Sequence, residues 1–429
     1  MKYGFIGLLV FGALFHFVGP YFYYEIYGFS SVYQSQQFFS FDQAVFNKVF
    51  LINVVPLLTA SVVVYFLPET EKVTPYKTRF SYIFYVLCSL WFIFFLIKAG
   101  GHKGILAGNL QGTWYTYTGL FLGLATAFTL TITHCERVNF IILGIGQIIL
   151  LMIGGSRSAP VALIVNFFIL MGVKIPRKKI FQYLGVVCFS VLSSIYFYDV
   201  ANYFRTPHFL AGRVSFTSVS EFTEGVEEAG GGRNGLVQIV GRISMLEVGM
   251  LPIIYKDIKH DKESMDIFHD KYSLKNQFGL FKNYFLPAFL KKYINDLSPN
   301  FFRRDTFPNQ YYRVSFLKEP MENIKKSYMS VNMGFPVYVY MWLSNFYLAA
   351  FIYTASLIFL YLLIAYTVKR FSTGAVLLFY ASYEFIVFFD FTQNLVVLLR
   401  AFFTLGTFIL IYKIIPMIFT RLYRSKKWI

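Results

Sequence analysis

The 429-residue chain is 56% hydrophobic and 21% aromatic but only 14% charged, which excludes an ordinary soluble globular protein. Its net charge of +17 is the kind of excess that Lys and Arg produce when they set orientation in a membrane, and we do not interpret it as nucleic-acid binding. The three cysteines, Cys88, Cys135 and Cys188, lie in apolar segments or a short connection, so no disulfide framework is expected.

About ten apolar segments follow one another along the chain, most of them close to the ~20 residues that a helix needs to cross a membrane. We place these predicted spans at 4–26, 44–66, 80–98, 114–133, 138–154, 158–173, 180–199, 337–366, 374–392 and 396–417. An alternative is that 330–344 forms a separate short or re-entrant helix. The sequence therefore predicts an all-α, polytopic membrane protein with about 10–12 transmembrane helices, because only helices satisfy every backbone group in such segments.

A long polar insert, residues 201–334, separates the seventh span from the eighth. It divides the chain into an N-terminal transmembrane bundle (1–200), a large and mainly helical loop or cap (201–334), and C-terminal helices with a basic tail (335–429). The insert mixes roughly 18 basic with 14 acidic residues, which is not the pattern of a nucleic-acid-binding arm.

Three local features of the insert are predicted. Residues 236–247 and 281–294 have the apolar spacing of helices that lie at a membrane interface. The cluster 257–261 is interpreted as a polar surface turn. Lysines such as Lys256, Lys259 and Lys262 are expected to be solvated.

Orientation follows from the short connections. If the N-terminus is cytoplasmic, the inner segments hold about sixteen Lys and Arg and the outer ones about three, as the positive-inside rule requires. Both termini are therefore expected in the cytoplasm. The large insert and the short turn at 154–157 are expected on the outer, periplasmic side.

That outer turn reads Gly154-Gly155-Ser156-Arg157-Ser158-Ala159-Pro160. Glycine and serine let the backbone turn tightly, and Pro160 suits the first turn of the next helix. An arginine beside a helix N-terminus makes a small anion site at the membrane surface. The alternative is that Arg157 only anchors a hairpin at the interface.

Further candidates gather in and near the insert. Arginine binds phosphate through two donors at once and keeps its charge, so we consider the insert arginines as ligands of a lipid diphosphate. They are Arg205, Arg213, Arg233, Arg242, Arg303, Arg304 and Arg313, with His208 beside the first. Arg400 in the last span either pairs with Asp390 or binds a diphosphate. The histidines are scattered without zinc-like spacing, so no metal or cofactor is predicted.

The chain resembles the O-antigen or oligosaccharide-repeat polymerase (Wzy) family of bacterial inner membranes. The resemblance covers nearly the whole layout. Locally it rests on the 154–159 turn, on Tyr203-Phe204-Arg205, on Gly241-Arg242 with Glu247, and on the segments 286–290 and 332–335.

The resemblance implies a lipid-diphosphate glycosyltransferase architecture of the GT-C type. Its substrates would be undecaprenyl-diphosphate-linked oligosaccharides, and it would also contact membrane lipids. It would transfer the growing glycan onto a new lipid-linked repeat unit and would need no cofactor. Arg157, Arg205 and Arg242 would stabilise the diphosphates, and Glu247 or His208 would accept the proton of the acceptor hydroxyl. The other arginines would help to bind substrate, and a chain-length-regulating co-polymerase would be a partner.

Two other functions stay open at this point. An O-antigen ligase has a similar plan and uses an outer-loop histidine, for which His208 is the candidate. A flippase or transporter usually has paired halves with short loops on both sides, which a single large insert does not match. A purely structural membrane protein is a further alternative.

Membrane-impermeant thiol labelling in intact cells tests the orientation. A single cysteine at Ser220 of the insert, in a cysteine-free chain, should react at the periplasmic face. A cysteine at Ser425 of the tail should react only after the cells are opened. Protection of the Ser220 position until lysis would place the insert in the cytosol and remove the basis of the functional argument.

Overall fold

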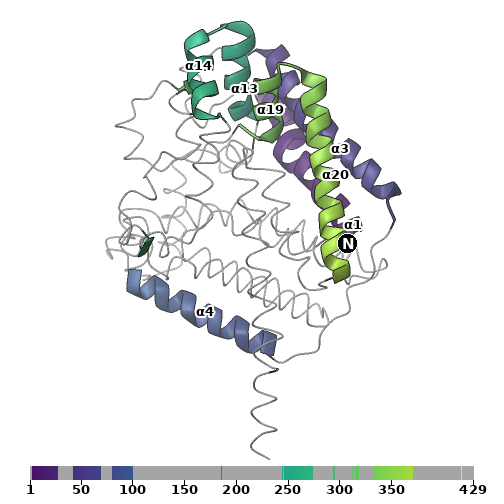
Figure 1. Ribbon diagram of the computed structural model, residues 1–429, viewed down its shortest axis with the longest axis vertical. Coiled ribbons are helices and arrows are strands. Elements are labelled where there is room, and N and C mark those ends of the chain that lie inside the picture. The colour runs from purple at the N-terminus through teal and green to yellow at the C-terminus, as the bar shows by residue number, and fades with distance from the viewer. Residues whose placement is uncertain are drawn as a thin grey trace, which may run out of the picture.

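The computed structural model describes residues 2–27, 42–68, 80–99, 185, 244, 246–273, 293–294, 312, 315–317, 333–370 and 417. Three helices in these ranges are long and apolar enough to cross a membrane: Lys2–Ile26, Gln43–Phe66 and Phe346–Thr367. The first two agree with the predicted spans 4–26 and 44–66. Together with short helices of the insert they form the group at the top right of Figure 1.

The first span is one continuous helix with a wide turn inside it. It consists of α1 (Lys2–Ala13), the π-helical turn η1 (Leu14–Val18) and α2 (Gly19–Tyr27). In the wide turn the N–H of Gly19 donates to the carbonyl of Leu14, five residues earlier. Pro20 follows directly and has no N–H, so one bond of the regular ladder is missing here. The helix therefore widens at the place where its hydrogen bonding is interrupted.

The second span, α3 (Gln43–Phe66), begins at an Asp42 cap, whose carboxylate accepts the N–H of Val45 at 2.9 Å. Two polar side chains lie on its buried face. Asn53 and Ser61 each donate to the backbone carbonyl four residues earlier, at 2.8 and 2.7 Å. Their polar groups are thus satisfied within the helix, as a helix surrounded by apolar groups requires.

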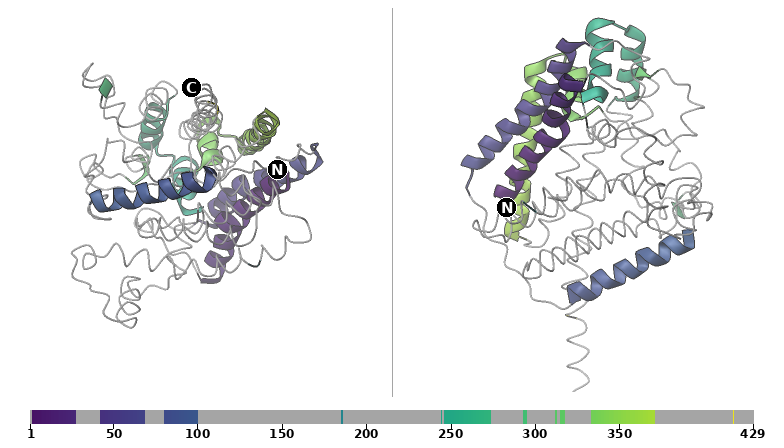
Figure 2. Two further views of the ribbon diagram at one scale, coloured as in Figure 1. Left: turned by 90° about the horizontal axis from the view of Figure 1, so that it is seen from below. Right: turned by 180° about the vertical axis from the view of Figure 1, so that it is seen from behind.

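α3 packs against both α1 and α20 (Phe346–Arg370), and the three helices lie together in the view from behind in Figure 2. Its buried face has the spacing of one helical stripe and includes Val49, Ile52 and Leu57, all 0% exposed. Its opposite face is just as apolar but 44–57% exposed, at Leu51, Val55, Leu58 and Val62. A helix that is apolar on its exposed side as well is typical of a membrane span.

The contacts at one end of this group fix the directions of its helices. The ammonium of Lys2, at the start of α1, donates to the carbonyl of Leu67 just after α3, at 2.6 Å. The hydroxyl of Tyr361, late in α20, lies 3.5 Å from the carbonyl of Pro68. α3 therefore runs antiparallel to α1 and parallel to α20.

Two parallel spans must be separated by an odd number of membrane crossings. The sequence predicts five spans between Phe66 and Phe346, at 80–98, 114–133, 138–154, 158–173 and 180–199. The direction of α20 is compatible with that number. An error of one span in this part of the chain would have reversed α20 relative to α3.

The described part of the insert folds onto the end of the bundle where α3 and α20 begin (Figure 1). We call it the capped end. The insert contributes α13 (Leu246–Ile253), the π-helical turn η5 (Ile254–Ile258) and α14 (Lys262–Lys271) to this end, and α19 (Phe335–Leu343), which follows the insert, lies there too. These helices come from two stretches of the chain that the sequence places more than sixty residues apart, and α3 contacts both α13 and α19.

α13 is buried in the protein, with Leu246, Met250 and Ile253 0% exposed. It passes so close to its neighbours that Gly249 has no room for a side chain. A Cβ there would lie 2.8 Å from Cγ1 of Val49 in α3 and 3.2 Å from Cγ2 of Val337 in α19. The predicted interfacial helix 236–247 lies outside the described residues except at 244 and 246–247, and those last two open a helix packed in the protein core.

α19 and α20 are separate helices. Ser344 ends α19 in the left-handed conformation, with φ 54°, and the side chain of Asn345 accepts the N–H of Leu348 at 3.0 Å to begin α20. The prediction of one continuous span over 337–366 is therefore wrong, and the alternative of a separate short helix before it is confirmed. The break lets the chain fold back: the ring of Phe335 in α19 lies 5.9 Å from that of Tyr353 in α20, between centroids and in a tilted arrangement.

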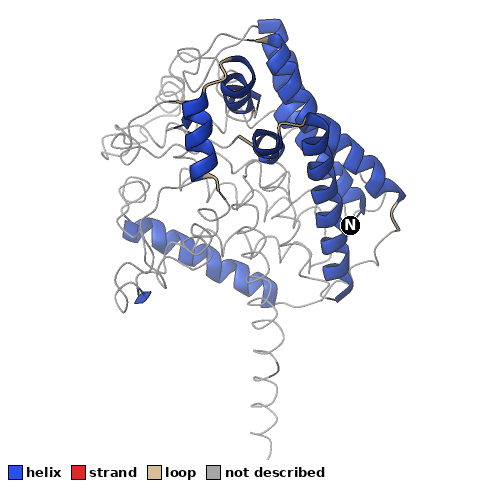
Figure 3. Ribbon diagram, turned by 45° about the horizontal axis from the view of Figure 1, so that its top comes forward, coloured by secondary structure: helices blue, strands red, loops and turns tan. Residues whose placement is uncertain are grey.

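α4 (Phe80–Ala99) is a helix over the predicted span 80–98. Predicted spans 114–133, 138–154, 158–173, 374–392 and the rest of 180–199 and 396–417 lie outside the described residues, as does the predicted helix 281–294 apart from 293–294. No strand occurs in the parts of the chain that Figure 3 colours by secondary structure. The all-α prediction is thus confirmed for these parts.

Replacing Gly249 with alanine should weaken the attachment of α13 to α3. The new methyl group must displace Val49 or Val337, which we expect to cost about 1–3 kcal/mol of unfolding free energy. Thermal unfolding of the purified protein in detergent measures the change.

Gly185→Ala is the matched control, because its Cβ would meet no described atom within 4 Å. The double variant Gly249→Ala with Val49→Ala should be less destabilised than the sum of the single variants. Additive effects would show that the two side chains do not compete for the same space.

Candidate functional site

The arginines predicted to bind a diphosphate fall outside the described residues, as does His208. They are Arg157, Arg205, Arg213, Arg233, Arg242, Arg303, Arg304, Arg313 and Arg400. Glu247 is placed by its backbone only, in the first turn of α13. That turn lies directly before Gly249, so the backbone of Glu247 is held close to α3 and α19.

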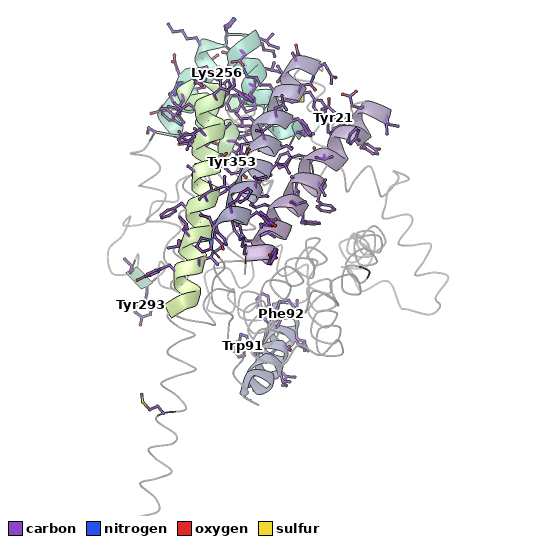
Figure 4. The ribbon with its side chains drawn as sticks, turned by 90° about the vertical axis from the view of Figure 1, so that its right-hand side faces the viewer. Tyr21, Trp91, Phe92, Lys256, Tyr293 and Tyr353 are labelled. Atoms are coloured by element: carbon purple, nitrogen blue, oxygen red, sulfur yellow. The ribbon has the colours of Figure 1, made fainter. Side chains whose placement is uncertain are left out.

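At the capped end the structure describes a polar cluster that joins three elements. We call Lys48, Lys256, Asp257 and Tyr340 the capped-end cluster. Lys48 comes from the second turn of α3, Lys256 and Asp257 from η5, and Tyr340 from α19. Figure 4 shows Lys256 at this end of the molecule, with Tyr353 lower in the bundle.

Lys48, Asp257 and Tyr340 form a closed triangle. The Nζ atom of Lys48 lies 2.5 Å from Oδ2 of Asp257 and donates to the Tyr340 hydroxyl at 2.5 Å. That hydroxyl donates to the Asp257 carboxylate, with oxygen–oxygen distances of 2.8 and 3.0 Å. A lysine near the end of an apolar helix is thereby paired by a carboxylate of the insert.

Lys256 occupies the other side of the cluster. Its Nζ atom donates to the backbone carbonyls of Tyr340 and Met341, both at 2.8 Å. These carbonyls lie in the last turn of α19, where the helix carries partial negative charge, and that of Tyr340 also accepts the N–H of Ser344 at 2.9 Å. The ammonium also lies 4.7 Å from the Tyr340 ring centroid, while Lys48 lies 4.3 Å from it.

Burial lowers the pKa of Lys256 to about 8; Asp257 opposes the shift and Lys48 adds to it. The folded chain protonates Lys256 less readily than the unfolded chain does. The contribution of Lys256 to the free energy of unfolding therefore falls as the pH drops from 10.5 to about 8, and it is constant below about 8. The pKa of His269 in α14 is also lowered, by burial first and then by Lys256, with Asp266 opposing. His269 is therefore uncharged over more of the neutral range.

A second polar group ties α2 to the start of α3. The hydroxyl of Tyr21 donates to Oδ1 of Asn47 at 2.9 Å. The amide of Gln43 donates to Glu25 at 2.6 Å and to Asn47 at 3.2 Å. Figure 4 places Tyr21 on the bundle at this end. This group consists of a phenol, two neutral amides and one carboxylate, and it holds no cation for binding an anion.

Aromatic rings hold α14 and α19 together beside the capped-end cluster. Phe268 of α14 lies 4.8 Å from Tyr272, 5.8 Å from Trp342 and 6.1 Å from Tyr338 between ring centroids. Tyr312 adds a bond from its hydroxyl to the carbonyl of Val248, at 2.8 Å. The cluster is thus fixed from the side of the insert by packed rings.

Two predictions about this region are wrong. Lys256 was expected to be solvated, but it is half-buried and bonded to α19 because the insert folds back on the bundle. Asp257 was expected in a polar surface turn, but it is paired with Lys48. Within that predicted turn, the exposed polar residues are Lys259 and His260. The missed signal is Lys48 itself, a charge inside an apolar run that needs a partner.

The chemistry available at the capped-end cluster is charge-assisted binding. It offers two ammonium groups, one phenol and one carboxylate. Among the described residues no group of three His, Cys, Asp or Glu could hold a metal ion. Comparisons with protein-family models, curated protein sequences and solved structures each found no match for this chain.

The reactivity of Lys256 toward an amine reagent, followed against pH by mass spectrometry of its peptide, should reach its midpoint near pH 8. Asp257→Asn removes the opposing charge and should move the midpoint lower. Lys48→Gln removes a repelling charge and should move it higher. Shifts of the same sign in both variants would contradict the assigned electrostatics, provided both proteins keep their elution volume in gel filtration.

Proposed function

We propose that this chain is an oligosaccharide-repeat polymerase of the bacterial inner membrane, of the Wzy type. It joins undecaprenyl-diphosphate-linked oligosaccharides at the periplasmic face. The growing glycan moves from one carrier onto the repeat unit of another, and undecaprenyl diphosphate is released. The proposal includes about 10–12 transmembrane helices in a GT-C-like arrangement and cytoplasmic termini.

One observation carries the proposal furthest: the described part of the polar insert, chiefly residues 246–273, is fastened to one end of the apolar helices. Lys48 and Asp257 join α3 to η5, and Gly249 lets α13 pass tightly beside Val49. A polar cap fixed over one face of a bundle suits an enzyme whose substrates are long lipids with sugar headgroups. It would hold acceptor and donor heads against the helices that contact their lipid tails.

The directions of the helices support a periplasmic cap. With a cytoplasmic N-terminus, α1 begins inside and α3 begins outside, which puts the capped end on the outer face. The parallel direction of α20 agrees with five crossings between them. Undecaprenyl-linked repeat units are polymerised on that side, where a cap of residues 201–334 could meet them.

The proposed reaction requires stabilisation of the negative charge that develops on the departing diphosphate, which arginines can supply without a metal. The non-reducing-end hydroxyl of the acceptor attacks the anomeric carbon of the donor glycan. The bond from that carbon to the diphosphate oxygen breaks, and its electron pair leaves with undecaprenyl diphosphate. Arg157, Arg205 and Arg242 would stabilise the departing charge, and Glu247 or His208 would take the hydroxyl proton.

The remaining candidates have supporting roles in this proposal. Arg213, Arg303, Arg304, Arg313 and Arg400 would bind the diphosphates or glycans of the two substrates. A chain-length-regulating co-polymerase would be the protein partner. Glu247 is the proposed proton acceptor that lies within the described residues, where its backbone belongs to α13.

Alanine substitution of Arg157 or Arg205 tests the proposal in a deletion strain complemented with each variant. Removing one donor from an anion-stabilising site typically costs about 10²–10³-fold in rate. Long polysaccharide should therefore disappear while single repeat units still reach the mature lipid, as gel electrophoresis of membrane glycolipids would show.

Arg137→Ala is the control, because this arginine is predicted in a connection on the opposite face. Protein levels should be equal in all strains. Polymer stranded on its carrier in the deletion strain would indicate a ligase instead, and carrier trapped inside would indicate a flippase. Normal chain lengths in both Arg157 and Arg205 variants would overturn the assignment.

A further inference from the structure

The capped-end cluster has an unused binding capacity. Each lysine ammonium carries three N–H donors. Lys48 uses two of them on Asp257 and Tyr340, and Lys256 uses two on the carbonyls of α19. Each amine therefore retains one donor without an acceptor among the described residues. Lys48 and Asp257 keep 31% and 26% of their side-chain surface exposed, so the cluster is open to a ligand.

The charges in the cluster favour an anion. The cluster holds two ammonium groups and one carboxylate. His269, which interacts with Lys256, has a lowered pKa and adds little further positive charge. The two amines share one neighbour, the Tyr340 ring, at 4.3 and 4.7 Å from its centroid. The separation of the two amines is therefore no more than the sum of these two distances, so both border the same small region around Tyr340.

The place of the cluster favours a lipid. Lys48 stands where the part of α3 without charged residues begins, which is the level of lipid headgroups if α3 crosses the membrane. Beside it, at the α19–α20 break, Trp342, Leu343 and Tyr347 are 37%, 42% and 82% exposed. Exposed tryptophan and tyrosine at a helix end are typical of the membrane–water interface.

We propose that Lys48 and Lys256 bind the phosphate of a lipid headgroup at the capped end, between α3 and η5. Asp257 positions Lys48 and the carbonyls of α19 position Lys256, so that one N–H of each amine points to the ligand. The acyl or prenyl chain lies along the exposed apolar residues near Tyr347. This site does not require glycan transfer, and it involves residues separate from the arginines proposed for catalysis.

Native mass spectrometry of the full-length protein in detergent tests this site. The probes are phosphatidylglycerol, a polyprenyl diphosphate, and a diacylglycerol that has the same chains but no phosphate. Lys48→Gln and Lys256→Gln should each weaken binding of the phosphate-bearing lipids about tenfold or more, since each removes a charge-assisted hydrogen bond. Diacylglycerol should bind weakly to every form.

Lys259→Gln is the matched control. This lysine belongs to the same segment, but its Nζ atom lies over a different ring, 4.4 Å from the centroid of Tyr255. Its loss should leave lipid binding unchanged. Preference for phosphatidylglycerol would identify a membrane phospholipid as the ligand, and preference for the diphosphate would identify the carrier; either supports the site.

A measurement on the unaltered protein covers the case in which the variants do not fold. A bound phosphate should raise the pKa of the Lys256 amine above about 8, so its labelling midpoint should move to higher pH when lipid is added. An unchanged midpoint at saturating lipid, or equal binding by wild type and a folded Lys256→Gln, would overturn the proposal. Loss of polymerisation in Arg157→Ala with intact lipid binding would separate the two proposals.

Discussion

An ionised lysine within an apolar helix needs a partner, and much of the described structure follows from how Lys48 is paired. Its partner Asp257 lies 209 residues later in the chain, and the pair is completed by the hydroxyl of Tyr340. Both side chains keep about a quarter to a third of their surface exposed, so the pair is a charge-assisted contact at the edge of the bundle. This contact joins α3 to η5 and α19.

Packing and charge agree at this junction. α13 passes beside α3 at Gly249, where any side chain would collide with Val49, and the rings around Phe268 fill the space between α14 and α19. Close packing therefore joins the same part of the insert to the bundle as the Lys48–Asp257 ion pair does. This agreement between local requirements is typical of a contact that specifies a single arrangement. It also explains why the insert cannot be regarded as a loop that is independent of the helices.

The long apolar helices could be predicted from the sequence because length and composition decide them: 4–26 and 44–66 agree with the structure within a few residues. The sequence predicted the break at Ser344 only as an alternative to one continuous span. The break depends on the left-handed backbone of Ser344 and on the packing of α19 back against α20. The capped-end cluster was missed because the three elements that supply it place Lys48, Asp257 and Tyr340 between 83 and 292 residues apart. Lys256 and Asp257 look like surface residues until the tertiary fold brings α19 beside them.

Lys256 binds main-chain oxygen atoms of α19, whereas Lys48 binds side chains. Every amino acid supplies a carbonyl, so replacements at Met341 would preserve the acceptor, limited only by the volume of a buried side chain. Asp257 and Tyr340 offer no such latitude, because their side-chain oxygens are the partners. Across diverging descendants of this chain, the two lysines, the aspartate and the tyrosine should therefore vary least, while the neighbouring methionine drifts among apolar residues of similar size.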